Sequence, residues 1–451
     1  MSGTDQTNPA ATSPGYLRRI FSNIGWLSFE RFFRLALSFS VGVIVARHLG
    51  PETFGKLNYA IAFFAILAPL AHLGSELIVV KELVRLPERA GETMGSALIL
   101  QIGGAVLALL IVAVLALFSP VAAPGDRLVI LVVGAGLLFQ PSVVIKSWFE
   151  SEVESRHVIR AEGLVLVLTA GIKITLVLTG AGLLSFALVF LLETGLIAIA
   201  RIIAYLTKAR RPQRWSPNWQ RSRFLFRESW PLMFTLLAVM LYMRIDQIMI
   251  GRMLGNYSVG IYSLAMQFVE VGYAIPQILV TTLFPSIVAL QLRDKERFVR
   301  RMEEFLAILV TIALLFSVAI ALVAEPLISL IFGQAYADAA PIVVVYVWAS
   351  VFVFVGTASG RWYIVEGLHK LALLRAVFGA IVNIALNLLL IPIYGLKGAA
   401  VATVISYVLH VMVFDAFFSR TRYMFRSKFK TLLLGPFIAA RAARDLLRRS
   451  S

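Results

Sequence analysis

The chain has 451 residues, of which 59% are hydrophobic and 15% charged, and its mean hydropathy is +0.85. A soluble domain of this length cannot bury so much apolar surface, so the composition excludes a soluble enzyme or binding module and predicts a polytopic membrane protein. The net charge is +17, but the basic residues lie in the breaks between apolar runs, so no nucleic-acid partner is expected. The absence of cysteine excludes disulfides and thiolate metal sites.

The first 19 residues are polar at their start and end in Arg18 and Arg19, and no removable signal peptide is expected here. About twelve apolar runs follow, each long enough to cross the hydrocarbon as a helix of about 20 residues. We place them near 20–46, 57–80, 95–117, 127–149, 158–179, 183–205, 228–250, 259–289, 303–325, 341–365, 371–391 and 397–418. No run alternates like a barrel strand, so the predicted fold class is all-α.

Two short segments resemble each other and stand at the same place in each half of the chain. Arg-His-Leu-Gly at 47–50 is followed by Gly55, and Arg-Met-Leu-Gly at 252–255 is followed by Gly260. Six predicted spans separate these segments, so both lie on one side of the membrane and the two halves run in the same direction. We therefore predict two six-helix lobes, related by a pseudo-twofold axis along the membrane normal.

The basic residues predict the orientation. Of the 42 Lys and Arg residues, 32 lie in the terminal segments and in alternate connections, and only five lie in the connections of the opposite side. Because basic residues gather on the cytoplasmic side, we predict that both termini are cytoplasmic.

These patterns also predict the organisation of the chain along its length. In order, we expect a cytoplasmic segment over 1–19, a first lobe over 20–205, a basic connector over 206–227, a second lobe over 228–418 and a basic cytoplasmic tail over 419–451. Within the tail, the apolar residues 431–440 are too few to cross the membrane. They indicate an interfacial amphipathic helix, with a frayed basic tail as the alternative.

Two motifs carry a family resemblance: Ala-Arg-His-Leu-Gly-Pro at 46–51 followed by Phe54 and Gly55, and Arg-Ile-Asp-Gln-Ile-Met-Ile-Gly at 244–251. With twelve spans in two lobes, the chain resembles the Wzx-like polysaccharide-transport flippases of the multidrug/oligosaccharidyl-lipid/polysaccharide (MOP) exporter superfamily. The resemblance covers nearly the whole chain and implies a MATE-like or MOP-like fold.

The resemblance also implies a function. A flippase of this family moves an undecaprenyl-diphosphate-linked oligosaccharide, such as an O-antigen or exopolysaccharide repeat unit, across the bacterial inner membrane by alternating access. It is a transporter and not an enzyme, and no cofactor is implied. The implied partners are the lipid-linked oligosaccharide, the lipid bilayer and other polysaccharide-assembly proteins.

Charged residues inside predicted spans cost about 2.5–3.5 kcal/mol each on insertion and usually face protein or water. The basic ones that fit a diphosphate headgroup are Arg34, Lys173 and Arg244. One Arg side chain can bind two phosphate oxygens at once, and Lys acts as a point charge. The acidic ones, which are candidates for counter-ions or for coupling, are Glu30, Glu193, Asp246 and Glu270. No histidine spacing indicates a metal site.

Each of these charges also has a purely structural interpretation. Glu30 and Arg34 are four residues apart and can neutralise each other on one helix face. Arg244 can extend to the membrane interface or pair with Asp246. For Glu193 and Glu270 we favour counter-ions of the buried cations over proton carriers.

Other polar residues in the spans carry weaker predictions. His72 and Glu76 are four residues apart and form either a hydrogen-bonded pair or a proton-sensitive one. Asn383 and Asn387 are one turn apart and are expected to join helices rather than to bind substrate. Arg361, Lys370 and Arg375 surround the turn between the tenth and eleventh spans and count among the cytoplasmic basic residues.

Two other functions compete with the flippase. A cation-coupled multidrug exporter of the same superfamily often has an acidic residue in the first span, but here Glu30 stands beside Arg31. A glycan polymerase or ligase needs a substantial external loop, and the connections predicted outside are short and nearly uncharged. The flippase is therefore the preferred function.

Overall fold

The computed structural model describes residues 14–118, 124–208, 214–291 and 294–450, and their side chains except those of 14–32, 124, 442–443 and 445–450. In these residues all regular structure is helical, which confirms the predicted all-α class. The first half of the chain contains α1 (Pro14–Ala71), α2 (Glu76–Arg85), α3 (Ala90–Leu117), α4 (Pro124–Ala135), α5 (Val143–Ser151), α6 (Arg156–Leu178) and α7 (Leu183–Lys208). The second half contains α8 (Trp219–Leu254), α9 (Asn256–Glu270), α10 (Ala274–Val288), α11 (Lys295–Phe332), α12 (Ala340–Tyr346), α13 (Ala349–Val365), α14 (His369–Tyr407) and α15 (Arg422–Ser450).

Nine helical stretches of the described chain are long and apolar enough to cross a membrane. The pair Gln334–Tyr346 and Ala349–Val365, bent by 53°, makes a tenth. Two of the nine contain a break, at Gly50 in α1 and at Gly395 in the stretch that begins with α14, and each joins two helical arms. Each of these two stretches therefore extends over two of the predicted ranges, whereas the described residues give nine or ten candidate spans in place of the predicted twelve.

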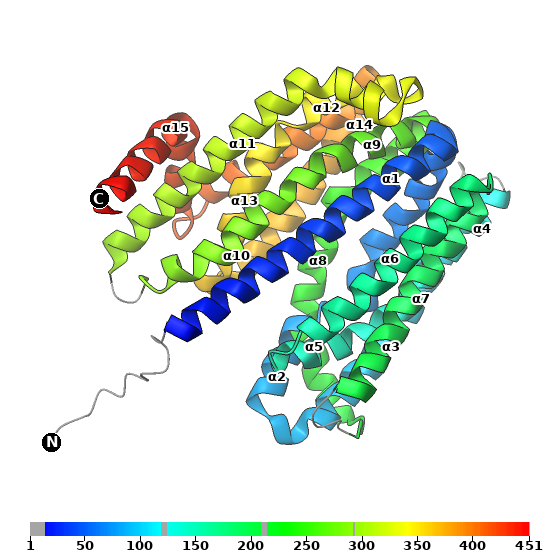
Figure 1. Ribbon diagram of the computed structural model, residues 1–451, viewed down its shortest axis with the longest axis horizontal. Helices are drawn as coiled ribbons and strands as arrows, with labels where there is room; N and C mark the ends of the chain where they lie inside the picture. The colour runs from blue at the N-terminus through cyan, green and yellow to red at the C-terminus, as the bar shows by residue number, and fades with distance from the viewer. Residues whose placement is uncertain (1–13, 119–123, 209–213, 292–293, 451) are drawn as a thin grey trace.

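The helices form two groups with α1 and α8 between them. Figure 1 shows α3, α4, α6 and α7 together on one side and α9 to α15 together on the other. The helix axes of the two groups diverge toward the end where the N-terminal part of α1 lies, and they meet at the opposite end, where α1 bends and α9 begins (Figure 1). One continuous hydrophobic core includes residues of both groups.

The two similar segments of the sequence have the same backbone conformation. Gly50 has φ 70° and ψ 168°, and Gly255 has φ 86° and ψ 175°. L-residues rarely adopt this conformation, so glycine is the residue that allows both turns. Gly50 and Gly255, which are 205 positions apart in the sequence, thus lie in two turns of the same kind.

These segments also contact each other reciprocally. A Cβ atom on Gly55 would lie 1.8 Å from the carbonyl oxygen of Asn256, and one on Gly260 would lie 1.9 Å from that of Pro51. Pro51 and Asn256 hold the same place in the two segments, so each segment makes the contact that the other makes. Local twofold symmetry follows for this contact, whereas its extension to two complete six-helix lobes stays a prediction.

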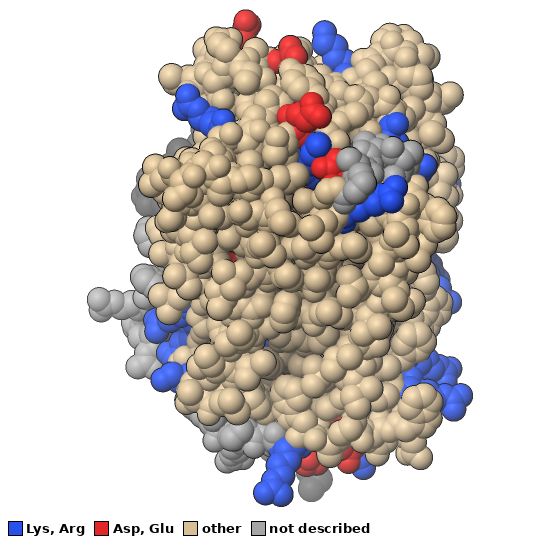
Figure 2. Space-filling view, turned by 90° about the vertical axis from the view of Figure 1, so that its right-hand side faces the viewer, with Lys and Arg blue, Asp and Glu red and all other residues tan. Residues whose placement is uncertain are grey.

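The outer surface of the bundle is apolar. Large side chains such as Leu164 on α6, Leu322 on α11 and Ile393 on α14 are exposed. Figure 2 shows a face whose centre is nearly free of charged side chains, which gather toward its top, bottom and edges. Lipid chains solvate such a surface and water does not, so the chain is a multi-pass membrane protein.

The tail is helical from Arg422 onward and packs on α11. Its buried face includes Met424, Lys428 and Thr431, while Leu433 and Phe437 on another face are exposed. A single helix therefore replaces the short 431–440 segment expected from hydropathy alone. Its contact with the membrane surface stays a prediction.

Candidate substrate cavity

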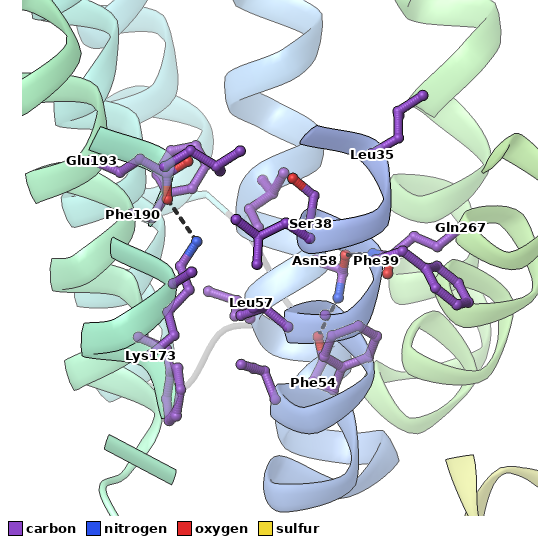
Figure 3. Close-up of a pocket in the computed structure, with 18 of the residues that line it drawn as sticks. Leu35, Ser38, Phe39, Phe54, Leu57, Asn58, Lys173, Phe190, Glu193 and Gln267 are labelled. Carbon is purple, nitrogen blue, oxygen red and sulfur yellow. Dashed lines mark hydrogen bonds and ion pairs between the residues drawn. The ribbon is translucent and has the colours of Figure 1, made fainter. Parts of the chain in front are cut away.

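A cavity of about 440 Å³ lies where α1, α6, α7 and α9 come together. Most of its wall is apolar, and Phe39 and Phe54 of α1 form part of it (Figure 3). Near the meeting end of the two helix groups, the rings of Phe54 and Tyr336 lie 6.2 Å apart, and the Tyr336 hydroxyl donates to the backbone oxygen of Ala46 at 2.9 Å. These contacts join the two groups beside the cavity.

One wall of the cavity holds an ion pair. Lys173, inside α6, donates from Nζ to Oε2 of Glu193, inside α7, at 2.6 Å (Figure 3). The two side chains are 24% and 20% exposed, so neither charge is surrounded by water. Because helices α6 and α7 each place one charge in a membrane span, pairing them lowers the cost of both.

The opposite wall holds a second ion pair. Glu270, the last residue of α9, lines the cavity and accepts a hydrogen bond from Nη2 of Arg244 on α8 at 3.0 Å. Oε1 of Glu270 is buried with no hydrogen-bond partner among the described residues. Arg244 thus pairs with Glu270 and not with Asp246, the partner considered from the sequence.

An amide bridge connects α1 to α9 on the wall of the cavity. Gln267 on α9 donates to Oδ1 of Asn58 on α1 at 3.1 Å, and Asn58 donates to the backbone oxygen of Phe54 at 2.9 Å (Figure 3). Both amides line the cavity. They place polar groups on a wall that is otherwise mostly apolar, as is usual in ligand-binding cavities.

Arg34 lies outside this cavity, in a separate ion cluster. Its Nη1 is 3.4 Å from Oε2 of Glu162 on α6, and Arg201 on α7 donates from Nε to Oε1 of the same carboxylate at 2.8 Å. Arg201 also donates to Ser142 at 2.9 Å. The side chain of Glu30, the partner predicted for Arg34, lies outside the described residues.

Asp246 is fully buried and belongs to a third site, between α8, α9 and α14. Its carboxylate accepts hydrogen bonds from Asn387 at 2.6 Å, from the Tyr262 hydroxyl at 2.8 Å and from the Thr403 hydroxyl. Asn387 also donates to Asn383 at 3.1 Å, as expected of residues that join helices. The ion pairs found among the described residues include none with Asp246.

The family profile described as polysaccharide biosynthesis protein matches residues 20–291, more than half of the chain. The chain belongs to this polysaccharide biosynthesis family. A second profile, described as lipid II flippase MurJ, matches residues 163–443. The resemblance to polysaccharide-transport flippases predicted from the two sequence motifs is thereby confirmed.

Two relatives are similar in sequence to this family member. The capsular polysaccharide biosynthesis protein CapF of Staphylococcus aureus is 23% identical over 405 residues, which cover 88% of this chain and 99% of CapF. The probable low-salt glycan biosynthesis flippase Agl15 of Haloferax volcanii is 24% identical over 255 residues, which cover 54% of this chain and 52% of Agl15.

Solved structures share the fold. An inward-facing multidrug resistance MATE transporter of the MOP superfamily superposes with a TM-score of 0.70 and 17% identity, covering 88% of this chain and 96% of that one. The lipid II flippase MurJ in an inward closed conformation superposes with a TM-score of 0.71 and 15% identity, covering 90% and 91%. These likenesses confirm the predicted MATE-like or MOP-like fold class.

The cavity thus collects some of the predicted residues and not others. Lys173, Glu193 and Glu270 line it, and Arg244 reaches it through Glu270. Arg34 and Asp246 lie in separate clusters. The predicted site residues did not include several others that these sites use, although each is a polar residue within a predicted span: Asn58, Ser142, Glu162, Arg201, Tyr262, Gln267 and Thr403.

Proposed function

We propose that the protein is a flippase that translocates an undecaprenyl-diphosphate-linked oligosaccharide, an O-antigen or exopolysaccharide repeat unit, across the bacterial inner membrane. The observation that carries the proposal is the cavity between the two helix groups, in a chain of this family. Lys173 lines one wall of this cavity, and Arg244 stands behind Glu270 of the opposite wall. The names of CapF and Agl15 support a glycan substrate. The protein acts as a transporter, with the lipid-linked oligosaccharide, the bilayer and other polysaccharide-assembly proteins as partners.

The ion pairs suit transient binding of a diphosphate. Lys173 and Arg244 are each matched by one carboxylate, so the empty cavity carries little net charge. An arriving diphosphate replaces Glu193 and Glu270 as the partner of the cations, and the carboxylates take up protons or turn to water. Because the cations are never left unpaired, exchange avoids the large cost of an isolated buried charge.

Asp246 is proposed as the coupling site. A carboxylate surrounded by neutral oxygen and amide groups can hold a proton or a small cation without an opposing fixed charge. Asn387 supplies a further oxygen, Oδ1, which is buried with no partner among the described residues. Tyr262 and Thr403 link this carboxylate to α9 and α14, so a change in its charge alters the packing of α8 against both helices.

The arrangement supports loading from the cytoplasmic leaflet. The helix groups diverge at the end that carries the basic connections, and they are joined at the other end by the Gly55 and Gly260 contact (Figure 1). With both termini cytoplasmic, the divergent end faces the cytoplasm. The polar headgroup then occupies the cavity while the polyprenyl chain stays in lipid, and a rocking motion of the two groups exposes the cavity to the other side.

Deletion of the gene tests this function. We expect lipid-linked oligosaccharide to accumulate on the cytoplasmic leaflet and surface glycan to disappear, with both restored by the wild-type gene. The Lys173→Ala and Arg244→Ala variant should be inserted normally and fail to restore export. Normal surface glycan together with increased drug sensitivity would instead establish the multidrug exporter.

A further inference from the structure

A second cavity, of about 630 Å³, lies between residues that come from both helix groups. The corner between α1 and α2 contributes His72 and Glu76, and α13 and α14 contribute Arg361, His369 and Arg375. The turn that joins α13 to α14 belongs to the side predicted to be cytoplasmic, so this cavity lies toward the cytoplasm from the substrate cavity.

The charges in this second cavity are not balanced. Arg361 and Arg375 line it, and Glu76 is the single carboxylate among its lining residues. None of the ion pairs found among the described residues includes these three side chains. Each cation of the substrate cavity, by contrast, has its own carboxylate. The second cavity therefore has a net positive charge and attracts anions.

Arg375 is held in place without a charged partner. Its guanidinium lies 4.7 Å from the centre of the Tyr363 ring, and Nη1 donates to the hydroxyl of Ser359 at 3.4 Å. The Tyr363 hydroxyl in turn donates to Asp415, whose other carboxylate oxygen accepts from Lys428 on α15 at 2.7 Å. Stacking on a fixed ring orients the planar guanidinium and leaves most of its donors available to a ligand.

Further hydrogen-bonding groups surround the two arginines. His72 lines the cavity and its Nδ1 is buried with no hydrogen-bond partner among the described residues. The side chain of His369 is exposed at the α13–α14 end. Two Arg forks with adjacent imidazole groups match a ligand that carries two linked phosphates, because each fork binds two phosphate oxygens.

We infer that this cavity is a binding site for the diphosphate group of the substrate on its way from the cytoplasm to the substrate cavity, with Arg361 and Arg375 as its ligands. The inference rests on the proposed flippase function and adds a first docking position to it. The site captures the headgroup where two arginines face a single carboxylate, Glu76, that is not ion-paired to either of them. The headgroup then moves to Lys173 and Arg244, where exchange with Glu193 and Glu270 limits the strength of binding.

Equilibrium binding to the full-length protein tests the site. One arm titrates inorganic pyrophosphate, and the other titrates undecaprenyl diphosphate carried in phosphatidylcholine nanodiscs. The R361Q and R375Q double variant should bind both ligands about tenfold more weakly than the wild type, since it loses two charged forks. Unchanged affinity for undecaprenyl diphosphate would overturn the inference, even if pyrophosphate binding fell, because the site would then serve a free anion.

Matched variants guard against indirect effects. Arg300→Gln removes an equal charge from an exposed residue of α11 that pairs with Glu304 at 3.5 Å, and it should leave both affinities within about twofold, as expected of a solvated surface charge. R361Q alone changes an exposed side chain and should fold normally, so its binding loss is interpretable even if the double variant is unstable. An equal loss in Arg300→Gln would contradict a specific site.

Transport kinetics separate this inference from the proposed function. The double variant should need about tenfold more substrate for half-maximal flipping, with a smaller effect on the maximal rate. If wild-type protein flips lipid-linked oligosaccharide and the double variant has the same half-saturation, the docking site is wrong and the flippase stands. If wild-type protein flips no such lipid, the proposed function itself is wrong.

Discussion

Lys173 and Glu193 have a role both in helix packing and, in the proposed function, in transport. Their ion pair at 2.6 Å crosses from α6 to α7 on the wall of the substrate cavity. Replacing the carboxylate by an amide keeps a hydrogen-bonding group of similar size and removes the charge that we propose to compete with a diphosphate. We therefore predict that this substitution raises the affinity for the substrate and lowers the rate of its release.

For Glu193→Gln we expect substrate affinity to rise by roughly threefold to tenfold, about 0.7–1.4 kcal/mol. Maximal flipping should slow, because release from the uncompensated Lys173 becomes harder. Binding and flipping of lipid-linked oligosaccharide by the reconstituted variant check both effects. Weaker binding with normal insertion would show that Glu193 is itself a substrate ligand.

Lys428 and Asp415 form an ion pair with both side chains completely buried. Burial lowers the pKa of Lys428 to about 8, and the charge of Asp415 opposes this shift. Lys428→Met leaves the carboxylate unpaired and should cost about 3–5 kcal/mol. The double variant with Asp415→Asn should recover most of the loss. Thermal unfolding measures both, and equal stability of wild type and Lys428→Met would contradict a structural role for the pair.

The sequence predicted which charges enter the membrane but not which of them meet. Arg34 and Glu30 are close in the chain, whereas Arg34 contacts Glu162, which is 128 positions away. Lys173 with Glu193 and Arg244 with Glu270 each join different helices. Such partners depend on the rotation and neighbours of each helix, and hydropathy contains no information on either.

At the scale of elements, α8 connects the two helix groups. Near its N-terminus, Arg221 pairs with the buried Glu82 of α2 at 2.8 Å, and Asn218 caps the helix and exchanges hydrogen bonds with Ser96 of α3. Near its other end, Asp246 is bonded to α14. The helix is thus fixed to different groups at its two ends.

Pro231 lies between these two attachments of α8. Proline removes one backbone hydrogen bond and costs about 3 kcal/mol inside a helix. Pro231→Ala should therefore raise thermal stability and slow flipping while leaving substrate affinity unchanged. Pro436→Ala in α15, which lies outside the connection between the groups, is the matched control. Undiminished flipping by Pro231→Ala would exclude this position as a hinge.

The ends of elements were less predictable than their existence. Apolar content predicted a span beginning near 228, but α8 begins at Trp219, because Asn218 caps it there and is hydrogen-bonded to Ser96 of α3. In the same way α11 begins at Lys295, after the capping residue Asp294, and not near 303. Hydropathy detects the part of a helix that lies in hydrocarbon, and caps define the part beyond it.

For the whole molecule, the orientation in the membrane follows from the charge distribution and has a direct test. The chain has no cysteine, so single cysteines can be introduced without altering the background. Trp219→Cys is on the predicted cytoplasmic side and Tyr257→Cys on the predicted outer side, and both side chains are exposed. An impermeant thiol reagent applied to intact cells should label only Tyr257→Cys. Labelling of Trp219→Cys would reverse the orientation.

The helical membrane fold and the family could be predicted from the sequence because they depend on composition and on local motifs. The paired similar segments also predicted a contact that the structure contains, between Gly55 and Gly260. The second cavity could not be predicted. In the sequence, Arg361 and Arg375 look like the basic residues of any cytoplasmic turn, and only the structure shows that residues of α1 and α8 lie beside them.

Flipping by purified protein in proteoliposomes tests the central claim most directly. Undecaprenyl-diphosphate-linked oligosaccharide is placed in both leaflets, and the fraction accessible to an impermeant glycan-modifying enzyme is followed in time. We expect wild-type protein to make the inner-leaflet pool accessible within minutes and Lys173→Ala to slow this at least about tenfold, a barrier increase of about 1.4 kcal/mol. An inner-leaflet pool as inaccessible with wild-type protein as in protein-free vesicles would contradict the flippase function.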